Sequence, residues 1–197
     1  LCGMNFSKRQ VEIILAATHL IGEKGVQNLT TKNLAKEIGF SEPALYRHFK
    51  DKTEIISSVL VYYKYELQLG LKSVISNDLS ALEKIDALVE FQFTHFTKYP
   101  AIIMVIFSET SFQYTSVLSN VVKSIMEEKS QGLINIIESG QKNNAIRADI
   151  SAQQLCTLVM GSMRLTVLRW RLSNFEFNLV NEGQTLKQTL KLVLTNK

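Results

Sequence analysis

Polar and cationic side chains recur on one face of a short segment in the first quarter of the chain. The members of this stripe are Pro43, Tyr46, Arg47 and Lys50. They stand at i, i+3, i+4 and i+7, so a helix that begins at Ser41 would carry them together, with Leu45 and Phe49 on the opposite side. The guanidinium of Arg47 can bond a guanine edge through two hydrogen bonds, and a major groove accepts such a helix. The stripe therefore indicates contact with DNA.

Two short helices around a tight turn would have to position this stripe. Thr30 is a candidate N-cap for the first helix, Gly39 is its candidate stop, and Ser41 is a candidate N-cap for the second helix. Four apolar side chains can form a small core between them, namely Leu34, Ile38, Leu45 and Phe49. Lys52 would stand in the first turn of the next helix, where its ammonium and backbone N–H groups can converge on one phosphate. The spacing predicts a helix-turn-helix.

The rest of the chain also has helical patterning. Apolar residues recur at helical spacing almost throughout, and the chain holds only two prolines. Capping boxes mark three helix starts, with the pairs Ser7 and Gln10, Asp51 and Glu54, and Ser151 and Gln154. The predicted helices cover residues 7–25, 30–39, 41–50, 51–76, 82–98, 102–109, 117–142, 151–172 and 179–195. We expect an all-α fold of about nine helices, with a three-helix DNA-binding domain over residues 1–54 and a helical ligand-binding and dimerisation bundle over residues 55–197.

The segment from Leu34 to Ile55, LAKEIGFSEPALYRHFKDKTEI, resembles the DNA-binding region of the TetR family of transcription regulators. The family pattern has a Thr that opens the second helix, a Leu-Tyr-x-His-Phe recognition helix and a Lys three residues after that Phe. Besides Gly25 and Thr30, the matching residues are Leu45, Tyr46, His48, Phe49 and Lys52. The likeness covers about the first quarter of the chain. Later, only Arg169-Trp170-Arg171 and residues 175–183 resemble the family, and more weakly.

The resemblance implies a dimer that binds a palindromic operator in double-stranded DNA. It implies phosphate contacts at Thr30, Tyr46, His48 and Lys52, and base contacts at residues 41–44 and Arg47. The full predicted DNA-binding set is Thr30, Thr31, Lys32, Ser41, Glu42, Pro43, Ala44, Tyr46, Arg47, His48 and Lys52. The family often has Gly or another small residue where Pro43 stands, and a proline has no backbone N–H to donate.

Aromatic residues gather in the middle of the chain, where more than half of them lie between Tyr62 and Tyr114. They can line a small-molecule cavity or simply pack a core, and both interpretations stay open. Gln92 falls on the face of Ile85 and Val89, where a buried amide needs partners from the protein or from an effector. The predicted set for an apolar or amphipathic effector is Tyr62, Tyr65, Gln92, Phe96, Phe107 and Phe112.

The last two predicted helices carry seams suited to helix pairing. One seam follows a 4-3-4-3 spacing through Leu179, Gly183, Leu186, Leu190 and Val193. The preceding helix has a face with small residues, made of Leu155, Val159, Ser162, Met163 and Thr166. In the TetR family these two helices pair with their symmetry mates in a four-helix bundle, so the resemblance implies a homodimer through these faces. Packing within one chain is the alternative.

Composition excludes several other classes of protein. The net charge of +4 permits a polyanionic partner without identifying one, and Cys2 and Cys156 are too far apart in sequence for a metal-binding motif. No apolar run approaches the roughly 18 residues that span a bilayer, and the N-terminus lacks the apolar core of a secretory signal. We therefore expect a protein of the bacterial cytoplasm, associated with the nucleoid, without a membrane span, a metal or a cofactor.

The main hypothesis is a one-component repressor that a small effector releases from its operator. The alternative is a chromosome-associated DNA-binding protein that answers to a protein partner, as nucleoid-occlusion members of the same family do. The sequence contains no nucleophile elbow, P-loop, dinucleotide-binding glycine pattern or pair of His or Glu at metal-binding spacing. We therefore do not expect an enzyme.

Overall fold

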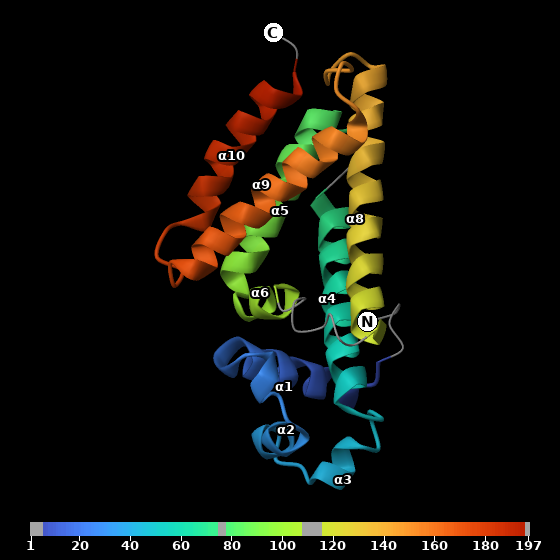
Figure 1. The fold of residues 1–197 in the computed structure, drawn as a ribbon, viewed down its shortest axis with the longest axis vertical. Coiled ribbons are helices and arrows are strands. Elements are labelled where there is room, and N and C mark those ends of the chain that lie inside the picture. Colours follow the sequence, from blue (N-terminus) through green and yellow to red (C-terminus); the bar gives the residue numbers. More distant parts are fainter. Residues whose placement is uncertain (1–5, 75–77, 108–115, 196–197) are drawn as a thin grey trace. The chain divides into compact units, whose positions relative to one another are not determined.

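The computed structural model describes residues 6–74, 78–107 and 116–195, in which the regular elements are helices (Figure 1). They are α1 (Lys8–Lys24), the 3-10 helix η1 (Val26–Asn28), α2 (Thr31–Glu37), α3 (Glu42–Leu45), α4 (Lys52–Val74), α5 (Ala81–Lys98), α6 (Ala101–Ile106), α8 (Ser116–Lys142), α9 (Ala152–Leu172) and α10 (Leu179–Leu194). The described ranges hold nine α-helices and no strand, which confirms the predicted all-α class. No helix in these ranges is both long and apolar enough to cross a membrane.

The chain divides into two compact units. Unit 1 comprises residues 1–67 and 99–125, and unit 2 comprises residues 68–98 and 126–197. Both α4 and α8 run through the division without a break. The predicted domain boundary after residue 54 falls inside unit 1, because the first half of α4 shares an apolar core with α1, α2 and α3.

Local capping bonds start most helices at the predicted residues. The Ser7 hydroxyl accepts from the Gln10 N–H while the Gln10 side chain accepts from the Ser7 N–H, which completes the predicted box. The predicted caps at Thr30, Asp51 and Ser151 likewise accept the N–H three residues on, at 3.1, 2.8 and 3.3 Å. Ser41 is different, since it occupies the N-cap position of α3 but its side chain makes no capping hydrogen bond. The predicted N-cap position of Ser41 is therefore confirmed without a side-chain bond, and Pro43 stands in the first turn of α3, which its fixed φ suits.

The recognition helix is shorter than predicted. Only residues 42–45 are α-helical, and residues 46–48 form a turn. Within that turn the N–H groups of His48 and Phe49 both donate to the Leu45 carbonyl, at 2.9 and 3.1 Å. The predicted stripe therefore lies on one helical turn and the tight turn after it. Gly39 ends the preceding segment with a φ of 68°, a left-handed conformation that a glycine adopts without steric cost.

A shared apolar core holds the helix-turn-helix in unit 1. Leu34, Leu45 and Phe49 expose at most 2% of their surface, and Ile38 packs against them partly buried. This confirms the core predicted from their spacing. The same cluster includes residues of α1, α4, α6 and α8, such as the fully buried Ile13. The two short helices are therefore fixed by neighbours from several longer ones.

The helices α1 and α6 approach each other closely at Gly22. A Cβ atom added there would lie 2.6 Å from the Ala101 Cβ and 3.1 Å from the Ala101 Cα. Because a backbone atom is one of these neighbours, a rotamer change cannot relieve the clash. The absence of a side chain at Gly22 therefore sets the distance between α1 and α6.

In unit 2, α10 lies beside α5 and α9 (Figure 1). A Cβ atom at Gly183 of α10 would lie 2.9 Å from Cδ2 of the fully buried Phe93 on α5. The Lys187 Nζ also donates to Glu90 Oε2 at 2.7 Å across the same pair of helices. These contacts show that the face of α10 that carries Gly183 and Lys187 packs against α5 of the same chain.

Replacement of Gly22 by Ala tests the close approach in unit 1. We expect Gly22→Ala to lower the free energy of unfolding by about 1–3 kcal/mol, because the α1 and α6 backbones must separate. The matched control is Gly132→Ala on α8, where a Cβ meets nothing within 4 Å; it should stabilise the protein by about 0.5–1 kcal/mol. Urea denaturation followed by circular dichroism measures both, and a stabilised Gly22→Ala variant would contradict the described contact.

Candidate nucleic-acid interface

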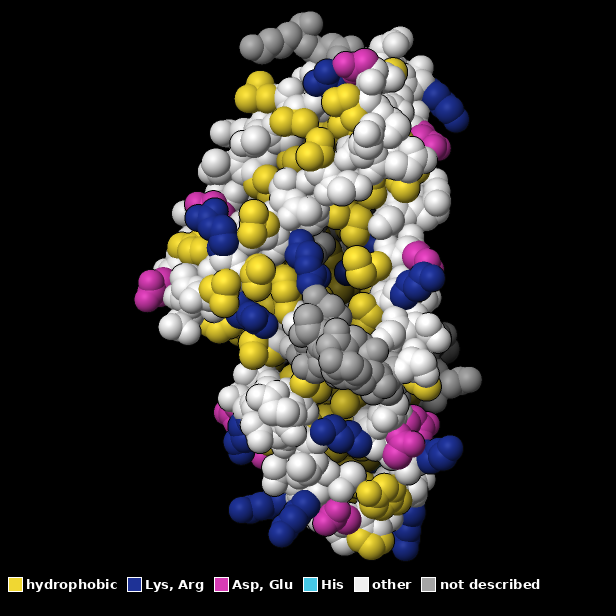
Figure 2. All heavy atoms as spheres, in the orientation of Figure 1, with side chains coloured by type: hydrophobic (Ala, Val, Ile, Leu, Met, Phe, Trp, Pro, Cys, Tyr) yellow, Lys and Arg dark blue, Asp and Glu magenta, His cyan; other side chains and the backbone are white. Residues whose placement is uncertain are grey.

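The turn after α3 presents its polar side chains to solvent. Tyr46 exposes 51% of its surface, and Arg47 is exposed beside it. The other exposed members of the predicted set are Thr30, Lys32, Ser41 and Pro43, while Thr31, Glu42, Ala44, His48 and Lys52 are half-buried. Figure 2 shows Lys and Arg side chains, with fewer acidic ones, at the end of unit 1 formed by α2 and α3. This surface has the polarity and charge that DNA contact requires.

Two predicted phosphate contacts lie at helix starts. The Thr30 hydroxyl accepts from the Asn33 N–H, so its own proton is available for a phosphate oxygen. Lys52 is the first residue of α4, at a helix N-terminus whose Glu54 N–H is already capped by Asp51. Both arrangements suit an anion.

The Gln10 side chain, predicted only as part of a cap, also supports the recognition turn, by which we mean α3 and the turn after it, residues 42–48. The Gln10 Nε2 donates to the His48 carbonyl at 3.1 Å, while its Oε1 accepts from the Ser7 N–H at 2.9 Å. One amide therefore closes the start of α1 and fixes the end of the recognition turn. Gln10 and His48 are 38 positions apart in sequence, so no local pattern predicts this bond.

A second bond joins the starts of α2 and α3. The Thr31 Oγ1 donates to Glu42 Oε2 at 2.7 Å, and both side chains are half-buried. A hydroxyl has one proton, so Thr31 in this state has none to give to a phosphate. The bond fixes the position of a carboxylate within the predicted base-contacting segment.

The predicted effector residues are divided between the two units. Tyr62, Tyr65 and Phe107 belong to unit 1, Gln92 and Phe96 belong to unit 2, and Phe112 lies outside the described residues. Phe96 is 2% exposed and therefore packs the core of unit 2, whereas Gln92 is half-buried.

Unit 2 places positive charge next to aromatic rings. The His95 ring lies 5.8 Å from the Phe91 ring and 6.5 Å from the Phe96 ring. Burial lowers the pKa of His95, and the charges of Lys98 and Lys129 lower it further. The Lys129 side chain reaches solvent, yet the protein atoms crowded around it lower its pKa as well. The charges of Lys98 and Lys129 would favour an anion beside His95, whereas burial by itself disfavours charge of either sign.

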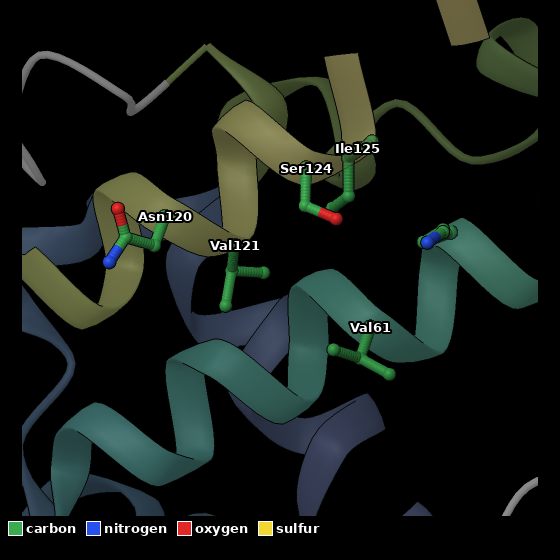
Figure 3. Close-up of a pocket in the computed structure, with 6 residues that line it drawn as sticks. Val61, Asn120, Val121, Ser124 and Ile125 are labelled. Carbon is green, nitrogen blue, oxygen red and sulfur yellow. The ribbon is translucent and has the colours of Figure 1, made fainter. Parts of the chain in front are cut away.

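A small surface pocket occurs in unit 1 between α4 and α8. It has a volume of about 280 Å³ and is lined by Val61, Lys64, Asn120, Val121, Ser124 and Ile125 (Figure 3). This is below the roughly 300–1,000 Å³ of most small-molecule sites, and none of the predicted effector residues lines it. Among the described residues, no group of three or more His, Cys, Asp or Glu could hold a metal ion.

Most of the predicted dimer residues are already buried within unit 2. Leu155, Val159, Met163, Leu179, Gly183 and Leu190 are buried, while Ser162, Thr166, Leu186 and Val193 are half-buried. The predicted seam of α10 packs on α5, as Gly183 and Phe93 show. The buried members therefore have little area left for a second subunit, and the dimer face stays a prediction.

A second face of α9 carries an exposed apolar row that was not predicted from the sequence. Leu158, Leu165 and Leu172 are 47%, 58% and 68% exposed, and Gly161 between them has open space around it. With the half-buried Leu168, the five residues follow a 3-4-3-4 spacing, as helix pairing requires. We call these five residues the α9 leucine row.

Comparison with known proteins agrees with this arrangement. A model of bacterial regulatory proteins of the tetR family matches residues 13–59, and a model of the Tetracyclin repressor-like C-terminal domain matches residues 82–174. Among curated proteins, the nucleoid occlusion factor SlmA of Haemophilus influenzae (strain PittGG) is 23% identical over 191 residues, covering 94% of this chain and 84% of its own length.

Solved structures share the fold over nearly the whole chain. The fatty acid degradation regulator FadR from Bacillus halodurans has a TM-score of 0.86 at 16% identity, covering 95% of this chain and 97% of its own. FadR from Bacillus subtilis in complex with stearoyl-CoA has a TM-score of 0.78 at 19% identity, covering 91% and 96%. The two family matches together with this shared fold show that the chain belongs to the TetR family of DNA-binding transcription regulators.

Proposed function

We propose that this regulator acts in the cytoplasm as a homodimer on a palindromic operator, as a repressor that a small effector releases. The observation that carries the proposal is the exposed recognition turn, which two bonds hold from opposite sides. Arg47 would read a base edge, and Thr30, Tyr46, His48 and Lys52 would contact phosphates. The proposed activity is binding, with no catalytic step.

The α9 leucine row supports dimerisation through a second copy of the same face. Isolated leucines on a surface need no partner, but a row of this spacing would be covered by an equivalent helix in a symmetric pair. The half-buried Ser162 and Thr166 of the predicted face lie at the edges of this row. A dimer would also present two recognition turns to the two half-sites of an operator.

An amphipathic effector with an anionic end fits unit 2. Lys98 and Lys129 place positive charge beside His95, and Phe91 and Phe96 add apolar surface there. Gln92 of the predicted set lies on the same helix as these aromatic residues. The FadR structure that contains stearoyl-CoA supports a long acyl chain as the apolar part.

The second candidate is a chromosome-associated protein that answers to a protein partner. The SlmA relatives favour it, since they are nucleoid occlusion factors. Both candidates need the same DNA-binding surface, so an effector assay separates them.

The first prediction distinguishes base reading from phosphate anchoring. Arg47→Ala should relax the preference at one base pair of each half-site, at a cost of about 1–3 kcal/mol. Lys52→Ala should weaken all sequences about equally and lower the salt slope by about 1 per half-site. Binding of both variants to a selected palindrome and to scrambled DNA across a salt series measures this. Unchanged DNA binding in both variants would overturn the proposed function.

The second prediction concerns the dimer. Leu165→Glu should shift the mass in solution from dimer to monomer, because a carboxylate in the middle of a buried helix pair costs several kcal/mol. Operator affinity should fall with it. Leu15→Glu is the matched control, since Leu15 is 47% exposed on α1 in unit 1. Analytical ultracentrifugation measures the mass, and a dimeric Leu165→Glu protein would place the interface elsewhere.

The third prediction tests the effector class with stearate and the uncharged stearamide. Stearate at 100 times its dissociation constant should stabilise the fold by about 2.7 kcal/mol and release the operator. Lys129→Met should weaken stearate about tenfold, or 1.4 kcal/mol, and leave stearamide unchanged. Lys142→Met, at the exposed end of α8, is the control. Equal affinity for the two lipids would contradict an anionic end, and the absence of any lipid binding would favour a protein partner.

A further inference from the structure

We infer that Glu42, held in place by Thr31, is a specificity residue that selects a cytosine in each half-site. The inference rests on the proposed function and adds a chemical preference to it. The bond from Thr31 Oγ1 to Glu42 Oε2 joins the two helices of the motif at the edge that carries the predicted base contacts.

The chemistry of the carboxylate determines which base it can meet. An ionised carboxylate only accepts hydrogen bonds, and Oε2 already takes the proton of Thr31. Oε1 can therefore accept from a base, and in the major groove the N4 amino group of cytosine is the donor that suits a Glu. Guanine presents acceptors at N7 and O6, and thymine presents one at O4, so these edges repel the carboxylate. Adenine presents an amino group at N6, but its N7 acceptor stands beside that group and disfavours the carboxylate.

Thr31 acts as the positioning residue. A free Glu side chain loses rotamer freedom when it binds, and it can also turn away from the negatively charged DNA. The hydrogen bond from Thr31 of α2 restricts the rotamers of the Glu42 side chain and keeps the carboxylate from turning away. Pro43 fixes the backbone directly after Glu42. A Glu42 carboxylate that cannot turn away lowers the affinity for every DNA sequence that lacks the amino group at this position. The pair of Thr31 and Glu42 therefore also disfavours binding to other operators.

The test uses the full-length protein and selection from a random DNA library. Wild-type protein should select a cytosine at one position of each half-site and bind a guanine-substituted site about fivefold or more weakly. Glu42→Gln should lose this preference. Thr31→Val, which keeps the shape but removes the hydroxyl, should reduce the discrimination without changing the preferences at other positions, and Thr31→Ser should restore it.

Several outcomes would overturn the inference. Retained cytosine preference in Glu42→Gln would show that Glu42 does not read the base. Unchanged discrimination in Thr31→Val, with the preference lost in Glu42→Gln, would remove the positioning role of Thr31. Equal loss of affinity for all sequences in Thr31→Val would show that the bond between Thr31 and Glu42 only stabilises the motif. Circular dichroism confirms that each variant is folded. If wild-type protein selects no sequence at all, the proposed function fails instead.

Discussion

The helix α3 is too short to hold its own conformation, so the position of every side chain proposed to contact bases depends on the burial of Leu45 and Phe49. A single helical turn is unstable in water because nucleation fixes several residues for one hydrogen bond. Each of these two side chains contributes roughly 1.5–3 kcal/mol when it is fully buried. The apolar core thus supplies the rigidity that the local backbone lacks. The side chains on the polar face are not needed for this packing and can therefore be suited to DNA contact.

Two side-chain hydrogen bonds add directional constraints to the apolar packing of that core. Gln10 reaches the last carbonyl of the recognition turn from α1, and Thr31 reaches its first side chain from α2. Apolar packing tolerates small rotations, whereas a hydrogen bond has a preferred length and angle. The combination is suited to a surface whose side chains must meet base edges within a fraction of an ångström.

Features that depend on near neighbours in sequence were predictable, and features that depend on distant pairs were not. The caps at Ser7, Thr30 and Ser151 follow from residues three apart, and the stop at Gly39 follows from the need for a positive φ. The Gln10 bond has no such signature. The dimer face shows the other limit, since α9 is apolar on two faces and spacing alone does not tell which one packs inside. Leu155 and Leu158 are the same residue type on the same helix. Only the packing of neighbouring helices buries Leu155 and leaves Leu158 exposed.

The continuity of α4 and α8 through both units restricts how this chain can change in length over evolution. Insertion of one residue after Leu67 would rotate all later positions of α4 by about 100° relative to the earlier ones, because an α-helix has 3.6 residues per turn. Additions and losses of residues are therefore expected to collect in connections such as residues 143–151, where helical phase does not carry across, while these two long helices keep a fixed count.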